Sequence, residues 1–123
     1  MNIIITRSTR PNKIWMVKVD KKTIHFGSKG ASDFTHHNDE TLKQAYIKRH
    51  QKRENWNDIF TAGFWSRWML WNKPTMSESA RSIDEHYDNV KLTLDYQVLP
   101  VDGSHIHLMI IYELLTLRSL RPH

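Results

Sequence analysis

The feature that most constrains the fold of this chain is a tryptophan-rich segment at residues 61–74, which holds three of the five tryptophans. Phe64, Trp68 and Trp71 follow one another at helical spacing, so the segment predicts a helix with an aromatic stripe along one face. Pro74 cannot continue a helix and sets the expected end. Each aromatic side chain removes about 150–250 Å² from water when it is buried. We therefore expect this helix to form the centre of the core.

The aromatic side chains of this helix admit a second interpretation. Aromatic residues at helical spacing usually belong to a core, but partner-binding grooves and base-stacking platforms also use them. The polar residues Ser66 and Arg67 are expected on the side of the helix away from Trp68 and Trp71. The residues expected to act as core or as partner anchor are Phe64, Trp65, Trp68 and Trp71.

The composition of the 123 residues limits what the chain can be. This length suits one domain, or one domain with a tail. Cysteine is absent, which excludes disulfide bonds, thiolate chemistry and zinc sites built on cysteine. Lys and Arg number 18 against 13 for Asp and Glu, and the net charge of +5 favours phosphate-rich or acidic partners. The apolar runs at residues 3–5 and 106–117 are too short for a membrane span, and no signal peptide is expected.

Periodicity predicts strands near both ends of the chain. Residues 2–6, 14–19 and 23–26 are rich in β-branched and aromatic side chains and are separated by turn signals, so they predict an antiparallel three-stranded sheet. Residues 90–98 alternate strictly between apolar and polar side chains, as in a half-buried strand. Residues 105–112 are expected to pair back as the second strand of a hairpin.

Three helices are expected between these strands. The first covers residues 40–53 and is capped by Asn38 or Asp39, with acidic residues in its first turn and basic residues at its end. The second is the tryptophan-rich helix. The third begins at a capping box formed by Thr75 and Glu78 and extends to about residue 87.

The fold class expected from these elements is α+β. A small N-terminal antiparallel sheet packs on about three helices, and a C-terminal β-hairpin or arm follows. Leu42 and Tyr46 are expected to face the core, while residues 31–38 are expected to be irregular. We expect one basic α+β domain at residues 1–89, with residues 90–123 packed on it or on a partner.

A series of motifs occupies the middle of the chain. They are Phe26-Gly27-Ser28-Lys29-Gly30, Asp33-Phe34-Thr35-x-His37-x-Asp39, Tyr46-Ile47-x-Arg49-His50-x-x-Arg53-Glu54, Thr61-Ala62-Gly63-Phe64-Trp65-Ser66-Arg67-Trp68 and Leu70-Trp71-Asn72-Lys73-Pro74-Thr75. In this order they resemble a family of small, largely uncharacterised proteins of nucleocytoplasmic large DNA viruses, of the iridovirus, phycodnavirus and mimivirus kind, over about residues 21–85. The resemblance implies a virus-encoded protein, located in the virion and, during infection, in the host cytoplasm or virus factory. It implies no catalytic residue and no cofactor, and the chain departs from the family pattern from Val90 onward.

Histidine and carboxylate residues suggest chemistry at two places. A metal-dependent nuclease could use the first group, although helix capping and structural histidines also explain it; its members are Asp33, His36, His37, Asp39 and His50. His105 and His107 would lie on one face of a strand, as half of a zinc site. Gly27 and Gly30 flank Lys29, but the spacing is not that of a phosphate-binding Walker loop and favours a sharp turn. No catalytic residue, metal or cofactor is assigned.

The function expected from the sequence is therefore interaction rather than catalysis. The chain is expected to be a virion structural protein, such as a minor capsid protein that contacts other capsid proteins. One alternative is a basic protein that binds DNA or RNA, with Phe34 and Trp56 stacking on bases; a metal-dependent nuclease is a minor one. The residues expected to contact phosphates or an acidic partner are Lys29, Lys43, Lys48, Arg49, Lys52 and Arg53.

Overall fold

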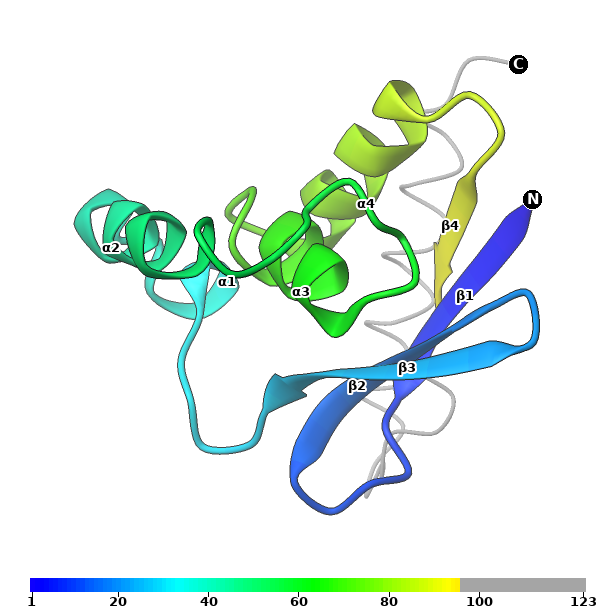
Figure 1. Cartoon of the computed structure of the whole chain (residues 1–123), viewed down its shortest axis with the longest axis horizontal. Coiled ribbons are helices and arrows are strands. Elements are labelled where there is room, and N and C mark those ends of the chain that lie inside the picture. The colour runs from blue at the N-terminus through cyan, green and yellow to red at the C-terminus, as the bar shows by residue number, and fades with distance from the viewer. Residues whose placement is uncertain (96–123) are drawn as a thin grey trace, which may run out of the picture.

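The structure, a computed structural model, describes residues 1–95 as a four-stranded sheet with helices packed against it (Figure 1). The strands are β1 (Asn2–Arg7), β2 (Lys13–Val19), β3 (Lys22–Ser28) and β4 (Lys91–Leu94), and they lie in the order β3-β2-β1-β4. The helices are α1 (Phe34–His37), α2 (Glu40–His50), α3 (Ala62–Trp65), the π-helix η1 (Ser66–Leu70) and α4 (Met76–His86). The expected α+β class, with an N-terminal sheet packed on helices, is confirmed.

Strands β1, β2 and β3 form the expected antiparallel arrangement. Ile5 pairs with Val17, and Val17 pairs with Ile24, so apolar side chains lie next to one another across three strands. The turn between β2 and β3 is tight, and Asp20 adopts a left-handed backbone with φ of 53°. Asp tolerates this conformation better than most residues because its short polar side chain can bond to the nearby backbone.

The strand expected at residues 90–98 lies within the described residues only as far as residue 95, and it pairs differently from the prediction. Strand β4 covers only Lys91–Leu94 and runs parallel to β1, with Leu92 opposite Ile3 and Leu94 opposite Ile5. A parallel pair needs a long crossover connection, which the helical part of the chain supplies. The sheet is therefore mixed rather than purely antiparallel. The hairpin partner expected at residues 105–112 lies outside the described residues, and the division of the chain at residue 90 stays a prediction.

The sheet and the helices share one apolar core. Alternate side chains of every strand are buried on the same face; they are Ile3, Ile5, Trp15, Val17, Val19, Ile24, Phe26, Leu92 and Leu94. Figure 1 shows α3 and α4 over this face, while α2 lies furthest from the sheet. Phe64 and Trp65 of α3 and Met69 of η1 are fully buried there. The rings of Trp65 and Phe26 have centroids 6.3 Å apart, and the Trp65 indole donates a hydrogen bond of 2.8 Å to the Ile59 carbonyl.

The tryptophan-rich helix forms, but it ends at Leu70 rather than at Pro74. Its second half is a π-helix, in which the backbone N–H of Trp71 donates to the Ser66 carbonyl at 3.1 Å. A π-turn is wider than an α-turn, so it changes the face on which later side chains lie. The π-helix could not be predicted from the sequence, because the helical pattern used for the prediction assumes 3.6 residues per turn.

The π-turn changes the predicted distribution of side chains. Phe64 and Trp65 are buried, whereas Trp68 and Trp71 are only partly buried and pack against the edge of the core. Arg67 does not lie on the opposite side from the tryptophans as expected. Its guanidinium carbon lies 4.3 Å from the centroid of the Trp68 ring.

The helix starts agree with the sequence prediction better than the helix ends. Asp39 caps α2, Thr61 caps α3 and Thr75 caps α4, each by accepting a hydrogen bond from a backbone N–H in the first turn. Helix α2 ends at His50 rather than at residue 53. Residues expected to be irregular form α1, because Asp33 caps that short helix. Within residues 1–95, none of the helices is long and apolar enough to cross a membrane.

Replacing Trp65 with alanine is expected to lower the free energy of unfolding by about 3–5 kcal/mol, because the side chain is fully buried between α3 and the sheet. Phe60, which is 38% exposed, provides the control, and Phe60→Ala is expected to lower this free energy by only about 1 kcal/mol. Urea denaturation followed by circular dichroism measures both. Equal effects of the two substitutions would contradict the central position given to Trp65.

Candidate interaction site

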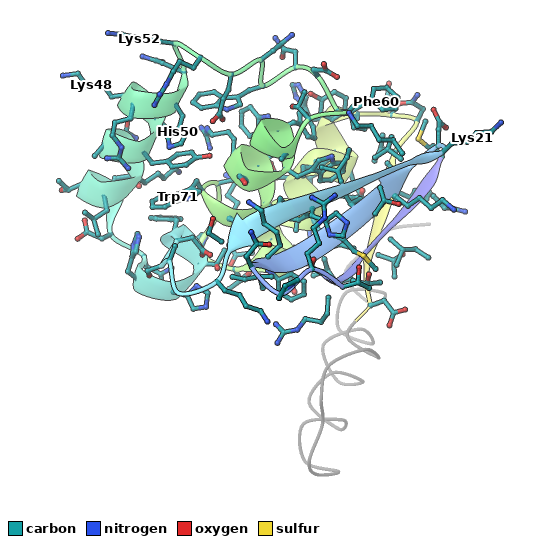
Figure 2. The ribbon with its side chains drawn as sticks, turned by 60° about the horizontal axis from the view of Figure 1, so that its bottom comes forward. Lys21, Lys48, His50, Lys52, Phe60 and Trp71 are labelled. Carbon is teal, nitrogen blue, oxygen red and sulfur yellow. The ribbon has the colours of Figure 1, made fainter. Side chains whose placement is uncertain are left out.

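Helix α2 is attached to the rest of the protein mainly through aromatic stacking. Tyr46 is its only buried residue, and its ring stacks on Trp71 with centroids 4.4 Å apart and planes 3° apart. His50, one turn later, stacks on the same tyrosine ring at 4.3 Å. Figure 2 shows His50 and Trp71 on the side of α2 that faces the rest of the protein. We call Trp71, Tyr46 and His50 the ring stack.

The exposed and buried residues of α2 differ in part from those expected. Leu42, which was expected to face the core, is 48% exposed, whereas Tyr46 is 6% exposed. Burial, and next the carboxylate of Glu54, raises the pKa of the Tyr46 phenol well above its ordinary value. The phenol therefore stays neutral, and the stacked Tyr46 ring holds the helix against Trp71.

Glu54 fixes the end of α2 to the segment that follows it. One carboxylate oxygen lies 2.7 Å from Nδ1 of His50, and the other accepts a hydrogen bond of 2.9 Å from the Trp56 indole. A Cβ at Gly63 would lie 2.7 Å from this carboxylate, so glycine leaves the space that Glu54 occupies. No role was expected for Glu54 from the sequence. The spacing of four residues between His50 and Glu54 was the signal that could have shown the pair.

A second layer of contacts covers Trp56. The Arg67 guanidinium lies 5.4 Å from the centroid of the Trp56 ring, and it also donates a hydrogen bond of 2.6 Å to the Trp71 carbonyl. The Trp56 carbonyl accepts a hydrogen bond of 2.8 Å from the Trp68 indole. Trp56 is therefore engaged within the protein.

Four of the six basic residues singled out from the sequence lie together on the outside of α2 and just after it. They are Lys48, Arg49, Lys52 and Arg53, all exposed, and we call them the α2 basic face. Figure 2 shows Lys48 and Lys52 extending away from the rest of the protein. Within residues 1–95, no ion pair joins any of the four to a carboxylate. This face therefore presents uncompensated positive charge to solvent.

The other two basic residues lie elsewhere. Lys43 donates a hydrogen bond of 2.7 Å to the Asn72 carbonyl, and its ammonium nitrogen lies 4.7 Å from the centroid of the buried Phe34 ring. Burial lowers the pKa of Lys43, while Glu40 opposes that change. Lys43 thus holds α2 in place, and Phe34 is not available to stack on a base. Lys29 lies at the end of β3 and lines a separate cleft.

The residues considered for metal binding or catalysis do not form one group among the described residues. Asp33 and Asp39 cap α1 and α2, His37 accepts a hydrogen bond from the backbone N–H of Asp39, and His50 pairs with Glu54. His36 lies 3.2 Å from the Asp33 carboxylate. In the part of the chain that the structure describes, no three His, Asp or Glu side chains form a group that could hold a metal ion. His105 and His107 lie outside that part.

Two clefts of about 460 Å³ each adjoin one another at the start of β2. Lys13 and Ile14 line both of them. One cleft contains the His50–Glu54 pair, and the other contains Arg7 and Lys29. The two clefts therefore join the region of the ring stack to the open end of the sheet.

The pKa of His25, a histidine beside these clefts, is affected by burial and by nearby positive charges. Nδ1 of His25 lies 2.8 Å from the hydroxyl of Ser8, and Ser8 lines the cleft that contains Arg7 and Lys29. Burial first, and then the positive charges of Arg10 and Lys13, lower the pKa of His25 from its ordinary value. The folded protein therefore favours the neutral imidazole.

Comparison with known proteins finds a family model that matches residues 3–50 and is described as a family of unknown function, DUF5754. The matched part covers the three antiparallel strands, α1 and α2, and it ends before the tryptophan-rich helix. No curated protein and no solved structure matches the chain. The comparison thus relates the N-terminal part of the chain to a family whose description gives no activity.

Replacing Tyr46 with alanine is expected to detach α2 from the ring stack. The loss of a large buried aromatic side chain costs about 3–5 kcal/mol in a core, and here it removes the main apolar anchor of the helix. Hydrogen exchange of the α2 amides is expected to become faster by a larger factor than that of the sheet amides. The control is Leu42→Ala on the exposed side of the same helix, and equal exchange rates in the two variants would contradict the anchoring role.

Acidification is expected to destabilise the protein partly through His25. In the unfolded chain this imidazole titrates near its ordinary pKa of about 6.5, and in the folded protein its pKa is lower. Between the two values the unfolded state binds more protons, so stability is lost as the pH falls below about 6.5. Urea denaturation at pH 7.5 and pH 5.5 (about one unit on either side of that value) is expected to show a smaller pH effect in His25→Gln. An unchanged pH effect would contradict this assignment.

Proposed function

We propose that this chain is a structural interaction protein of a large DNA virus, whose α2 basic face binds an acidic surface of another virion protein. A minor capsid protein that contacts larger capsid proteins would act in this way. The observation that carries the proposal is the exposed set of four cations, without a carboxylate partner in residues 1–95, at the end of a helix held by the ring stack and in the turn that follows it. The resemblance to proteins of large DNA viruses supports the virion, and the virus factory before assembly, as the place where it acts.

A helix held in one position suits the binding of a protein surface. Tyr46 and Lys43 attach α2 at two points, to the ring of Trp71 and to the carbonyl of Asn72. The four cations are thereby presented in a fixed arrangement, and less side-chain and backbone freedom is lost when the partner binds. Complementary charge across such an interface contributes mainly to specificity and to the rate of association.

Binding of DNA or RNA is the second candidate function, because the same cations would contact phosphates. The contacts of Phe34 and Trp56 within the protein favour a protein partner over a nucleic acid. Phe34 is buried beneath Lys43, and the partly buried Trp56 contacts Arg67 and the Tyr46 ring, so both rings already have partners within the protein. Nucleic-acid binding by this face would depend on phosphate contacts alone and would fall steeply with salt.

The proposal predicts that a carbodiimide, which joins amines directly to carboxylates in contact, links Lys48 or Lys52 to Asp or Glu residues of another virion protein. The particles are purified from infected cells, and the linked peptides are identified by mass spectrometry. The variant Lys48→Gln, Lys52→Gln, Arg53→Gln is expected to lose about tenfold in incorporation into particles, because three exposed charged contacts of about 0.5 kcal/mol each contribute about 1.5 kcal/mol together. Arg49 is kept because it also lines a cleft.

The matched control removes the same number of exposed charges elsewhere, in the variant Lys18→Gln, Lys21→Gln, Lys91→Gln. It is expected to enter particles like the unaltered protein. Abundance of the unaltered protein in infected cells with its absence from purified particles would refute a virion role. Salt-sensitive binding of the purified protein to DNA or RNA, lost in the α2 variant and kept in the control, would support the second candidate instead.

A further inference from the structure

The cleft at the open end of the sheet is lined by cations from three separate segments. Arg7 ends β1, Lys13 begins β2 and Lys29 follows β3, and all three side chains line one cleft of about 460 Å³. None of the residues that line it is Asp or Glu. A space of this volume is large enough for a nucleotide-sized ligand.

Backbone pairing brings these segments together. Arg7 is opposite Trp15 in the register of β1 and β2, and Lys13 is opposite Ser28 in that of β2 and β3. The backbone N–H of Lys29 donates to the Asn12 carbonyl at 3.2 Å, which places Lys29 beside the start of β2. The three cations therefore converge because of the sheet, although the sequence separates them.

One wall of the cleft orients the Arg7 side chain, and the backbone of Gly30 leaves another part of it open. The Arg7 guanidinium lies 5.4 Å from the centroid of the Trp15 ring, a distance typical of a cation–π contact. Gly30 has a φ of +84°, and no atom lies within 4 Å of the position that its Cβ would occupy, so the backbone there is open to the cleft. Nearby, the carboxylate of Asp33 is already engaged by the Thr35 backbone N–H and by His36.

Positive charge therefore exceeds negative charge at this cleft. Burial is the first cause of the lowered pKa of His25, and the nearby charges of Arg10 and Lys13 add to it. Arg and Lys side chains that converge without a carboxylate are suited to phosphate, whose oxygens accept several charge-assisted hydrogen bonds.

We propose that the cleft formed by Arg7, Lys13 and Lys29 binds adjacent phosphate groups, as carried by a nucleoside triphosphate or by the phosphorylated end of a nucleic acid strand. The site differs from a Walker loop, because it uses side chains from three segments rather than the backbone of one glycine-rich turn. It shares no residue with the α2 basic face. A test that refutes phosphate binding at this cleft therefore leaves the proposed function unaffected, and the reverse also holds.

The first test is calorimetric titration of the full chain with pyrophosphate, which is expected to bind saturably at low salt. Arg7→Gln and Lys13→Gln are each expected to weaken this binding about tenfold, the loss expected for one hydrogen bond to a charged group. The control is Lys18→Gln, an exposed residue of the same strand β2, which is expected to leave the affinity unchanged. Thermal unfolding of each variant shows whether it is folded at the titration temperature, and Arg7→Lys is expected to restore part of the affinity if charge is what matters.

Two further titrations show whether the bound phosphate groups belong to a nucleotide or to the end of a nucleic acid strand. Tighter binding of ATP than of pyrophosphate indicates a nucleotide, and tighter binding of a 5′-phosphorylated oligonucleotide than of its 5′-hydroxyl form indicates a nucleic acid end. Phosphate bound near Lys13 is also expected to raise the pKa of His25, which its imidazole NMR signals report. The proposal is overturned if pyrophosphate does not saturate the protein, or if Lys18→Gln weakens binding as much as Lys13→Gln does. It is also overturned if binding is lost only in the α2 variant Lys48→Gln, Lys52→Gln, Arg53→Gln.

Discussion

Burial of Phe64 and Trp65 against the inner face of the sheet is the interaction on which the rest of the described structure depends. Both side chains are fully buried and lie between the strands and α4. Because α3 and η1 are fixed there, the chain can turn after Leu70 and place α4 beside them, where the buried Ser79 hydroxyl accepts a hydrogen bond from the Lys73 backbone N–H at 3.1 Å. Helix α4 then leads to β4, which can pair in parallel with β1 only after such a crossover.

The tryptophans also use their polar atoms to order the segment between α2 and α3. The indole of Trp65 donates to the Ile59 carbonyl, that of Trp68 to the Trp56 carbonyl, and that of Trp56 to Glu54. A buried indole N–H needs an acceptor, and here each acceptor belongs to residues that would otherwise form a loose connection. The same aromatic side chains therefore supply the core and determine where α2 lies relative to it.

Among residues 1–95, several of the positive charges occupy three different environments. Lys43 and Arg67 are partly buried and bond to backbone carbonyls, so their role is to hold neighbouring segments. The α2 basic face is exposed and separate from the core. Arg7, Lys13 and Lys29 surround a cleft at the end of the sheet. Within residues 1–95, exposed positive charge is therefore divided between the α2 basic face and this cleft, which share none of these cations.

The sequence by itself determined the α+β class, the antiparallel strands and the starts of α2, α3 and α4, because alternation and capping depend on residues close together in the chain. It also identified the four cations of the α2 basic face, since these occupy successive turns of one helix and the residues just after it. Only the tertiary structure decided that β4 pairs in parallel with β1, that the tryptophan-rich helix contains a π-turn, and that Glu54 fixes His50. It alone separated Lys29 and Lys43 from the other cations and brought Arg7, Lys13 and Lys29 to one cleft. These features depend on contacts between residues far apart in the sequence, and a local pattern of side chains does not encode such contacts.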